Sequence, residues 1–303
     1  MPSPVSDVVS RLPAAPGVYR FRGEGGRALY IGRAVDLRRR VRSYWGDLRD
    51  RRHLRRMVPR IAAVEAVVCD SEHEAAWLER NLLEHRKPYW NRVRGGMEVP
   101  VHIRLDERRG SASLSVVHQV EGSTRHFGPY LGGSKVRLAV AGLHRVLSLA
   151  YAGDGLTGSD ADMARVRGVE PGRRADLVRT AIALLQRDPP AVETVRDELV
   201  RRRDESASGL LFEQAARIQA ELEAVEWVVA PQRATSPSPD DADVNGFADG
   251  VLVSFEIRAG RLRAWSQRAC APAAAAPLVA RTSPEWTDFA QRAAGLAARL
   301  ALP

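Results

Sequence analysis

The chain has 303 residues, of which 45% are hydrophobic, and its formal net charge is +9. This length allows more than one hydrophobic core, so we expect two or three modules. Because it holds neither an apolar run of about 18 residues nor a secretory signal at Met1–Pro4, we expect no membrane span and no export. Two cysteines, Cys69 and Cys270, are too few for a disulfide framework, and this usage fits a cytoplasmic protein.

The positive charge is concentrated at the start of the chain. Residues 1–60 hold 15 arginines, no lysine and five acidic residues, which accounts for the whole excess of positive charge. A charge run is usually a solvated face. The arginines between 38 and 42 and between 49 and 56 have almost no acidic neighbours, however, and this favours a face that binds a polyanion.

Two short β-like runs, Gly17–Arg22 and Ala28–Gly32, flank a glycine-rich turn, and this pattern predicts a β-hairpin. The hairpin carries Tyr19 and Tyr30 and leads into an arginine-rich helix. Tyrosines that face guanidinium groups suit a phosphodiester better than a carbohydrate or a peptide.

The arginine-rich helix is predicted to begin after Asp36, which can cap it, and to end near Tyr44. Leu37, Val41 and Tyr44 fall on one face, and Arg40 lies beside that face. We expect a second basic helix over about 50–61 and a third strand over 63–69.

A further helix is predicted from Ser71, with Glu74 completing a capping box, to about Arg86. On this helix Glu79 is surrounded by apolar residues, so its carboxylate must be protonated, paired or bound to a cation. Its spacing alone leaves a salt bridge to an arginine and a metal ligand nearly even. The surrounding residues are Ala75, Ala76, Leu82 and Leu83.

These motifs resemble those of the GIY-YIG nucleases. With the rest of the chain they resemble the N-terminal part of the UvrC family, the nuclease component of excinuclease ABC, from about residue 11 to residue 230 and faintly to about 270. The resemblance implies an α+β fold: a small domain with a three-stranded antiparallel sheet flanked by helices, a mixed middle region, an αα-hairpin and a small C-terminal α/β remnant. The implied catalytic residues are Tyr19, Tyr30, Arg40, Tyr44, Glu79 and Asn91.

By the same resemblance, Glu79 binds Mg²⁺ or Mn²⁺, and water activated by Tyr30 or by the metal attacks the phosphorus. A tyrosine base requires a lowered pKa, for which Arg33 and Arg40 are the expected cause. The substrate is double-stranded damaged DNA, so the protein is expected at the nucleoid. The expected DNA-binding residues are Gly32, Arg33, Arg38, Arg42, Arg52, Arg55 and Arg56.

Two positions depart from the family pattern. Arg33 stands where the family usually has lysine, and arginine cannot serve as a proton donor or acceptor. Trp90 stands at the tyrosine position of the family's Pro-x-Tyr-Asn ending.

Beyond the nuclease motifs, two β-like runs are predicted over 99–117 around a turn at 106–110, and a helix over 134–149. The segment His126–Tyr130 is interpreted as a turn with a structural role. Residues 151–158 replace the family's cysteine-rich segment without any cysteine, so we expect no iron–sulfur cluster or zinc there.

Two amphipathic helices over 191–203 and 210–229 predict an antiparallel hairpin. The second resembles the UVR motif, through which UvrC proteins meet the excinuclease component UvrB, so residues 193–229 are the expected partner site. A helical hairpin is common and needs no partner. The expected contact residues are Phe212, Glu213, Ala215, Ala216 and Ile218.

The predicted domains are a nuclease domain over 11–95, a middle region over 96–188, the hairpin over 189–232 and a C-terminal remnant over 243–303. The expected function is metal-dependent incision of DNA on the 3′ side of a lesion in nucleotide excision repair. The alternatives are a non-catalytic regulator that binds DNA and UvrB, and a stand-alone structure-specific nickase.

Overall fold

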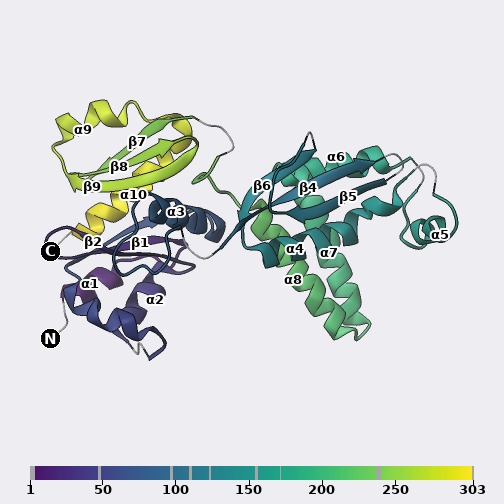
Figure 1. Ribbon diagram of the computed structural model, residues 1–303, viewed down its shortest axis with the longest axis horizontal. Helices are drawn as coiled ribbons and strands as arrows, with labels where there is room; N and C mark the ends of the chain where they lie inside the picture. The colour runs from purple at the N-terminus through teal and green to yellow at the C-terminus, as the bar shows by residue number, and fades with distance from the viewer. Residues whose placement is uncertain are drawn as a thin grey trace. The chain divides into compact units, whose positions relative to one another are not determined.

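The chain has a mixed α+β architecture, as predicted, and it forms two compact units (Figure 1). A computed structural model describes residues 4–46, 49–95, 98–108, 111–122, 124–153, 156–170, 172–236 and 240–301. The first unit comprises residues 1–97 and 231–303, and the second comprises residues 98–230. Among the described residues, no helix is long and apolar enough to cross a membrane.

The first unit contains the predicted three-stranded antiparallel sheet, in the order β2-β1-β3. The face predicted from Leu37, Val41 and Tyr44 is fully buried against Tyr19 and Phe21. The elements are α1 (Pro4–Ser10), β1 (Gly17–Arg22), β2 (Ala28–Ala34), α2 (Leu37–Arg42), η1 (Ser43–Trp45), β3 (Ala63–Val68) and α3 (Glu72–His85).

The second basic helix differs from its prediction. Instead of one helix over 50–61, the chain forms two 3₁₀ helices, η2 (Arg49–Arg56) and η3 (Val58–Arg60). Pro59 explains the break, because proline has no backbone N–H and its ring clashes with the preceding helical turn. Leu54 and Met57 are buried and hold this segment on the core.

The C-terminal segment folds onto the same unit. Its antiparallel sheet has the order β7-β8-β9, and α10 lies between this sheet and the β1–β3 sheet (Figure 1). Residues 11–95 and 243–303, which were predicted as two domains, therefore pack within one unit. The elements are β7 (Ala242–Ala248), β8 (Val251–Arg258), β9 (Arg261–Ala269), α9 (Pro272–Val279) and α10 (Pro284–Ala301).

Buried polar contacts hold the C-terminal segment in place. Ser71 accepts a hydrogen bond from the backbone N–H of Glu74 and so caps α3, as predicted. The Glu74 carboxylate does not complete the predicted capping box, because its backbone donors are residues other than Ser71. The buried Glu74 carboxylate accepts from the backbone N–H of Asp70 and from that of Arg233. Burial raises the pKa of Glu74, which the two backbone donors oppose. The guanidinium of Arg20 lies 4.2 Å from the centre of the Trp265 ring and donates to the Trp265 carbonyl.

The second unit combines an antiparallel sheet, in the order β5-β4-β6, with a layer of helices. The interpretation of His126–Tyr130 as a turn is wrong, because this segment is in strand β6 and pairs with β4. Its Phe127 and Tyr130 side chains are buried in the core. The strands are β4 (Pro100–Arg108), β5 (Ser111–Val117) and β6 (Arg125–Leu131).

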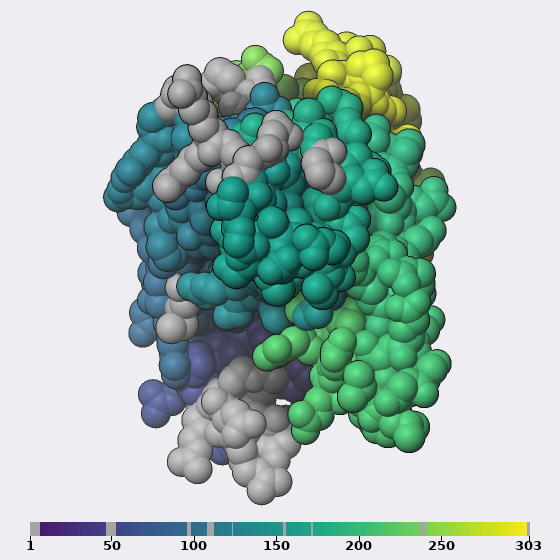
Figure 2. Space-filling model, turned by 90° about the vertical axis from the view of Figure 1, so that its right-hand side faces the viewer, coloured from purple at the N-terminus to yellow at the C-terminus, as the bar shows by residue number. Residues whose placement is uncertain are grey.

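The helices of the second unit include the predicted αα-hairpin, formed by α7 and α8 and drawn in green in Figures 1 and 2. Asp188 caps α7, and Gly209 follows its last turn. The segment predicted without metal ligands, 151–158, includes residues 154 and 155, which lie outside the described residues. The helices are α4 (Gly133–Leu147), η4 (Leu149–Tyr151), α5 (Ser159–Val166), α6 (Arg174–Leu185), α7 (Pro189–Ser208) and α8 (Phe212–Val229).

Candidate active site

Three tyrosines from three different elements meet in the first unit. Tyr19 lies on β1, Tyr30 on β2 and Tyr44 on η1. The hydroxyl oxygens of Tyr19 and Tyr44 are 2.7 Å apart and share a hydrogen bond. The ring centre of Tyr30 lies 6.3 Å from that of Tyr19 and 5.9 Å from that of Tyr44. The predicted hairpin and helix thus bring these side chains together.

Gly32 makes this cluster possible. It is opposite Tyr19 in the β1–β2 register, and the Tyr19 ring crosses the space where a side chain would be. A Cβ at this position would lie 2.6 Å from Tyr19 Cζ and 2.8 Å from Tyr30 Cε1. Gly32 therefore shapes the cluster through its missing side chain.

Arg40 supplies the positive charge at the cluster. Its Nε donates a hydrogen bond to the Tyr19 hydroxyl at 3.3 Å, and its Cζ lies 5.8 Å from the Tyr44 ring centre. Burial lowers the pKa of Arg40, but Tyr19 and Tyr44 outweigh this and raise it. The half-buried guanidinium remains charged and can bind an anionic oxygen.

The expectation of a lowered tyrosine pKa is wrong for this structure. Burial is the largest cause that raises the pKa of Tyr30, and Tyr44 and Glu79 add to the rise, while Arg40 opposes it. Burial likewise raises the pKa of Tyr19 and of Tyr44. At neutral pH all three hydroxyls carry their protons and can donate hydrogen bonds.

Glu79 lies on α3 with its side chain 21% exposed, and its Oε2 is 3.6 Å from Nε of Arg33. Both interpretations of Glu79 therefore remain compatible with the geometry, because an accessible ion-paired carboxylate can still bind a cation. Among the described residues, no group of three or more His, Cys, Asp and Glu side chains could hold a metal ion. A single carboxylate fits Mg²⁺, which usually keeps several of its waters.

Asn91 contacts the protein backbone. Its Oδ1 accepts a hydrogen bond from the Ile31 N–H at 3.0 Å, and its Nδ2 donates to the Ile31 carbonyl at 2.7 Å. The neighbouring Trp90 donates its backbone N–H to the Leu29 carbonyl. The segment after α3 thus fixes β2 on both sides of Tyr30, at Leu29 and Ile31.

The expected DNA-binding arginines have different surroundings. Arg38 is exposed, but its Nε donates to the Leu12 carbonyl at 2.6 Å and so also holds the segment before β1. Arg42, Arg55 and Arg56 are exposed. The side chain of Arg52 lies outside the described residues.

The expected DNA-binding residues did not include Arg39 or Val35, although Arg39 belongs to the arginine run that favours a polyanion. Both line a pocket of about 490 Å³ beside Arg33 and Arg40. Arg39 is exposed, and 62% of Val35 is exposed. For Arg39 the available signal was its place in the arginine run, and Val35 has none.

Most of the expected partner residues on α8 lie at the surface. Phe212 is 65% exposed, Glu213 and Ala216 are exposed, and Ala215 is half-buried. Ile218 is different, because it is buried in the core of the second unit. A fully buried side chain is not available to a partner, so the expectation that Ile218 is a contact residue is wrong.

A small antiparallel sheet that places one tyrosine on each of two paired strands, beside an arginine and a glutamate, defines a GIY-YIG-type domain. Residues 15–92 match the family described as the UvrC-like GIY-YIG domain, so this part of the first unit is such a domain.

The similarity extends over most of the chain. The chain is 32% identical over 273 residues to the UvrABC system protein C of Desulforudis audaxviator, and the match covers 85% of this chain and 44% of that protein. The chain is 29% identical over 279 residues to the protein of the same name from Geobacter metallireducens, and that match covers 84% of this chain and 44% of that protein. The chain thus spans less than half the length of these curated relatives.

Among solved structures, the chain is similar to the GIY-YIG N-terminal endonuclease domain of UvrC from Thermotoga maritima bound to its catalytic divalent cation, magnesium. The identity is 31%, the match covers 29% of this chain and 96% of that chain, and the TM-score is 0.27.

Proposed function

We propose that the chain is a metal-dependent endonuclease that cuts one strand of damaged double-stranded DNA on the 3′ side of a lesion. The observation that carries this proposal is the cluster of Tyr19, Tyr30, Tyr44 and Arg40 beside Glu79, within a UvrC-like domain. The UvrABC system proteins to which it is similar support a role in nucleotide excision repair.

Each residue of the cluster has a role in this proposal. Arg40 binds a non-bridging phosphoryl oxygen and neutralises the charge that develops there. Tyr19 and Tyr44, coupled through their hydroxyls, orient Arg40 and the phosphate. Tyr30 is neutral, and its hydroxyl orients the attacking water. A divalent cation held by Glu79 would supply charge stabilisation at the leaving oxygen.

The substrate strand would continue over the pocket next to the cluster. Arg33 and Arg39 line it and suit backbone phosphates, and the exposed Val35 suits a deoxyribose. Arg42, Arg55 and Arg56 would add contacts to phosphates farther along the duplex.

The helical hairpin would recruit the enzyme to UvrB. Its tip exposes Leu210 (73%) and Phe212 (65%), with Leu211 between them. Exposed apolar side chains at a helix turn are suitable anchors for a partner. The proposed contact residues are Phe212, Glu213, Ala215 and Ala216. Ile218 is not among them, because it is buried in the core.

The test is a single-turnover nicking assay on a duplex with one bulky adduct, in Mg²⁺ and then in Mn²⁺. We expect Glu79→Gln and Arg40→Ala to abolish nicking while the circular dichroism spectrum and Tm stay close to those of the unmodified protein. Wild-type nicking by either folded variant would contradict the assignment. Binding of DNA and UvrB without any nicking would favour the regulator, and nicking that ignores the lesion would favour the stand-alone nickase.

A further inference from the structure

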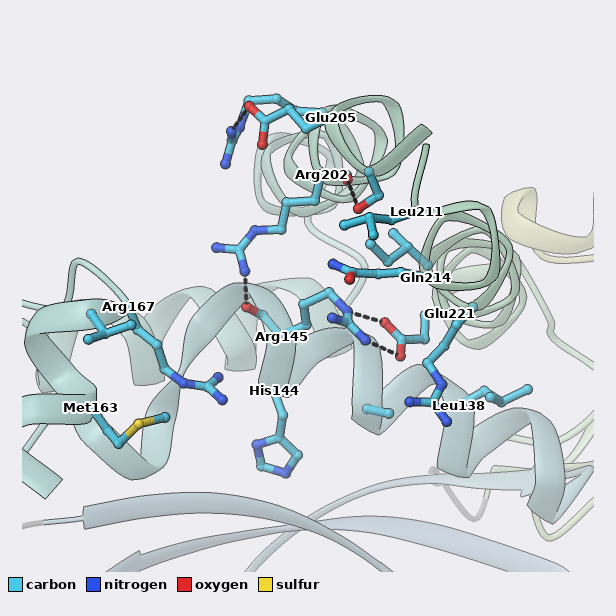
Figure 3. A pocket seen from close by; sticks show the side chains of 16 residues that line it. Leu138, His144, Arg145, Met163, Arg167, Arg202, Glu205, Leu211, Gln214 and Glu221 are labelled. Atoms are coloured by element: carbon cyan, nitrogen blue, oxygen red, sulfur yellow. Dashed lines mark hydrogen bonds and ion pairs between the residues drawn. The ribbon is translucent and has the colours of Figure 1, made fainter. Parts of the chain in front are cut away.

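The second unit contains an open groove of about 1160 Å³ between α4, α5 and the α7–α8 hairpin. Figure 3 shows its side chains, with Leu138, His144 and Arg145 on one side, Met163 and Arg167 on another, and Glu205, Leu211 and Gln214 from the hairpin. Every lining residue belongs to this unit.

Apolar side chains from separate elements face the groove without joining the core. Leu138 on α4, Met163 and Val166 on α5, and Leu211 before α8 are all exposed, and Val166 reaches 81%. Single exposed apolar residues are ordinary, but four that line one hollow form an apolar surface of a kind that marks interaction sites.

Internal ion pairs make the floor of the groove neutral. Arg145 donates from Nε and Nη2 to the two carboxylate oxygens of the buried Glu221, at 2.6 and 2.8 Å. The Arg145 carbonyl accepts a hydrogen bond from Nη1 of Arg202 at 2.6 Å. Figure 3 shows these contacts linking α4, α7 and α8. The three helices are held in fixed positions, so the groove is largely preformed.

Two further arginines at the groove, Arg167 and Arg217, differ from Arg145 in their partners. Within the part of the chain that the structure describes, neither Arg167 nor Arg217 forms an ion pair with a carboxylate. The guanidinium carbon of Arg167 lies 4.9 Å from the Tyr151 ring centre, a contact that uses its flat face and not its N–H donors. Figure 3 shows Arg167, the residue that follows α5, extending into the groove.

We propose that this groove binds one amphipathic α-helix of a partner protein, with an apolar stripe flanked by aspartate or glutamate. A helical cylinder about 10 Å wide and about 15 Å long, or about ten residues, has nearly the volume of the groove. The four apolar side chains receive the stripe, and Arg167 and Arg217 pair with the acidic flanks.

A nucleic acid fits this groove less well. Nucleic-acid binding requires a row of unpaired cations and commonly aromatic rings on which bases stack. Here Arg145, Arg201 and Arg202 are already paired with carboxylates, and none of the lining residues is Phe, Tyr or Trp.

The inference goes beyond the proposed nuclease, because no residue of the first unit takes part. The groove adjoins the exposed tip formed by Leu210 and Phe212 and shares Leu211 with it, but neither Leu210 nor Phe212 lines the groove.

The test measures fluorescence anisotropy on the full chain with a labelled peptide of about 16 residues, helical by design, with leucines at i, i+3, i+4 and i+7 and glutamates on both flanks. The matched control peptide has lysine at each glutamate position, and a labelled single-stranded oligonucleotide represents the alternative occupant. We expect the acidic peptide to bind at least about tenfold more tightly than the lysine peptide.

The protein variants locate the binding. Arg167→Glu combined with Arg217→Glu should weaken the acidic peptide at least about tenfold. Arg165→Glu is the control, because Arg165 is exposed on α5, two residues before Arg167, and does not line the groove, and it should leave binding unchanged. Phe212→Ala should also leave it unchanged, which separates the groove from the tip.

The proposal is overturned if the acidic peptide does not bind, if the lysine peptide binds equally well, or if the double variant binds like the unmodified protein. It is also overturned if the oligonucleotide displaces the peptide from the groove. Nicking activity measured on the variants at Arg165, Arg167 and Arg217 stays unchanged, so a failure here is distinguishable from a failure of the nuclease proposal.

Discussion

Nε of Arg33 lies 3.6 Å from Oε2 of Glu79, so the carboxylate that we propose as the metal ligand is held by an ion pair across β2 and α3. An arginine that neutralises a carboxylate also competes with a cation for it. This pair therefore links the departure from the family pattern at Arg33 to the affinity for metal.

We predict that Arg33→Gln binds Mn²⁺ several-fold more tightly than the unmodified protein. The cation then no longer has to displace a partly exposed ion pair, which is worth about 1 kcal/mol. Isothermal titration measures the affinity directly. Arg42→Gln, which removes an exposed charge elsewhere on the arginine-rich segment, is the control and should leave it unchanged. Equal affinity of Arg33→Gln and the unmodified protein would show that the pair does not compete with metal.

Gly32→Ala should destabilise the first unit by about 1–3 kcal/mol, since its Cβ would overlap the rings of Tyr19 and Tyr30. The nicking rate should also fall, because the hydroxyls of Tyr19 and Tyr30 must move. Urea unfolding gives the stability. Gly25→Ala is matched, since a Cβ there meets nothing within 4 Å, and it should behave like the unmodified protein. A Gly32→Ala protein of normal stability and activity would contradict the close packing.

The pH profile tests the protonation of Tyr30. A raised pKa keeps this hydroxyl protonated at and well above neutral pH, so we propose that it orients water and does not act as a base there. We expect Tyr30→Phe to lower the nicking rate about 10²-fold by the same factor at every pH between about 6 and 9. If the nicking rate of the unmodified protein rises with pH and that of Tyr30→Phe does not, the prediction is wrong and Tyr30 acts as a base.

Asn91→Asp should lower the stability of the first unit by about 1–3 kcal/mol, because the Ile31 carbonyl loses its donor and faces a carboxylate. Thermal unfolding measures this change. A positioning role for Asn91 predicts a fall in Tm and in nicking together, with metal affinity retained. Lost nicking at an unchanged Tm would place Asn91 in direct contact with the substrate.

Local spacing accounts for what the sequence could predict. Leu37, Val41 and Tyr44 are buried as expected, because residues three and four apart share one helical face. The hairpin forms where the sequence predicts it, but the strands and the turn alone do not give its register. An irregularity between Phe21 and Arg22 shifts the pairing by one residue and so brings Gly32 opposite Tyr19.

Contacts between residues distant in the sequence account for what it could not predict. Asn91 bonds to Ile31, and Trp265 packs on Arg20, and neither pairing leaves a periodic signal. Spacing also shows which residues of α8 share a face, but not which face α4 covers, so the burial of Ile218 was missed. The pKa of Tyr30 depends on its burial, and arginine content alone gave the wrong direction.

The position of the cut tests the central proposal most directly. The substrate is a duplex with one bulky adduct, labelled at the 5′ end of the damaged strand, with UvrA, UvrB and Mg²⁺, and Glu79→Gln is the control. We predict a single cut on the 3′ side of the adduct that requires UvrB and is absent in the variant. A cut on the 5′ side, or a cut that persists in Glu79→Gln, would contradict the account.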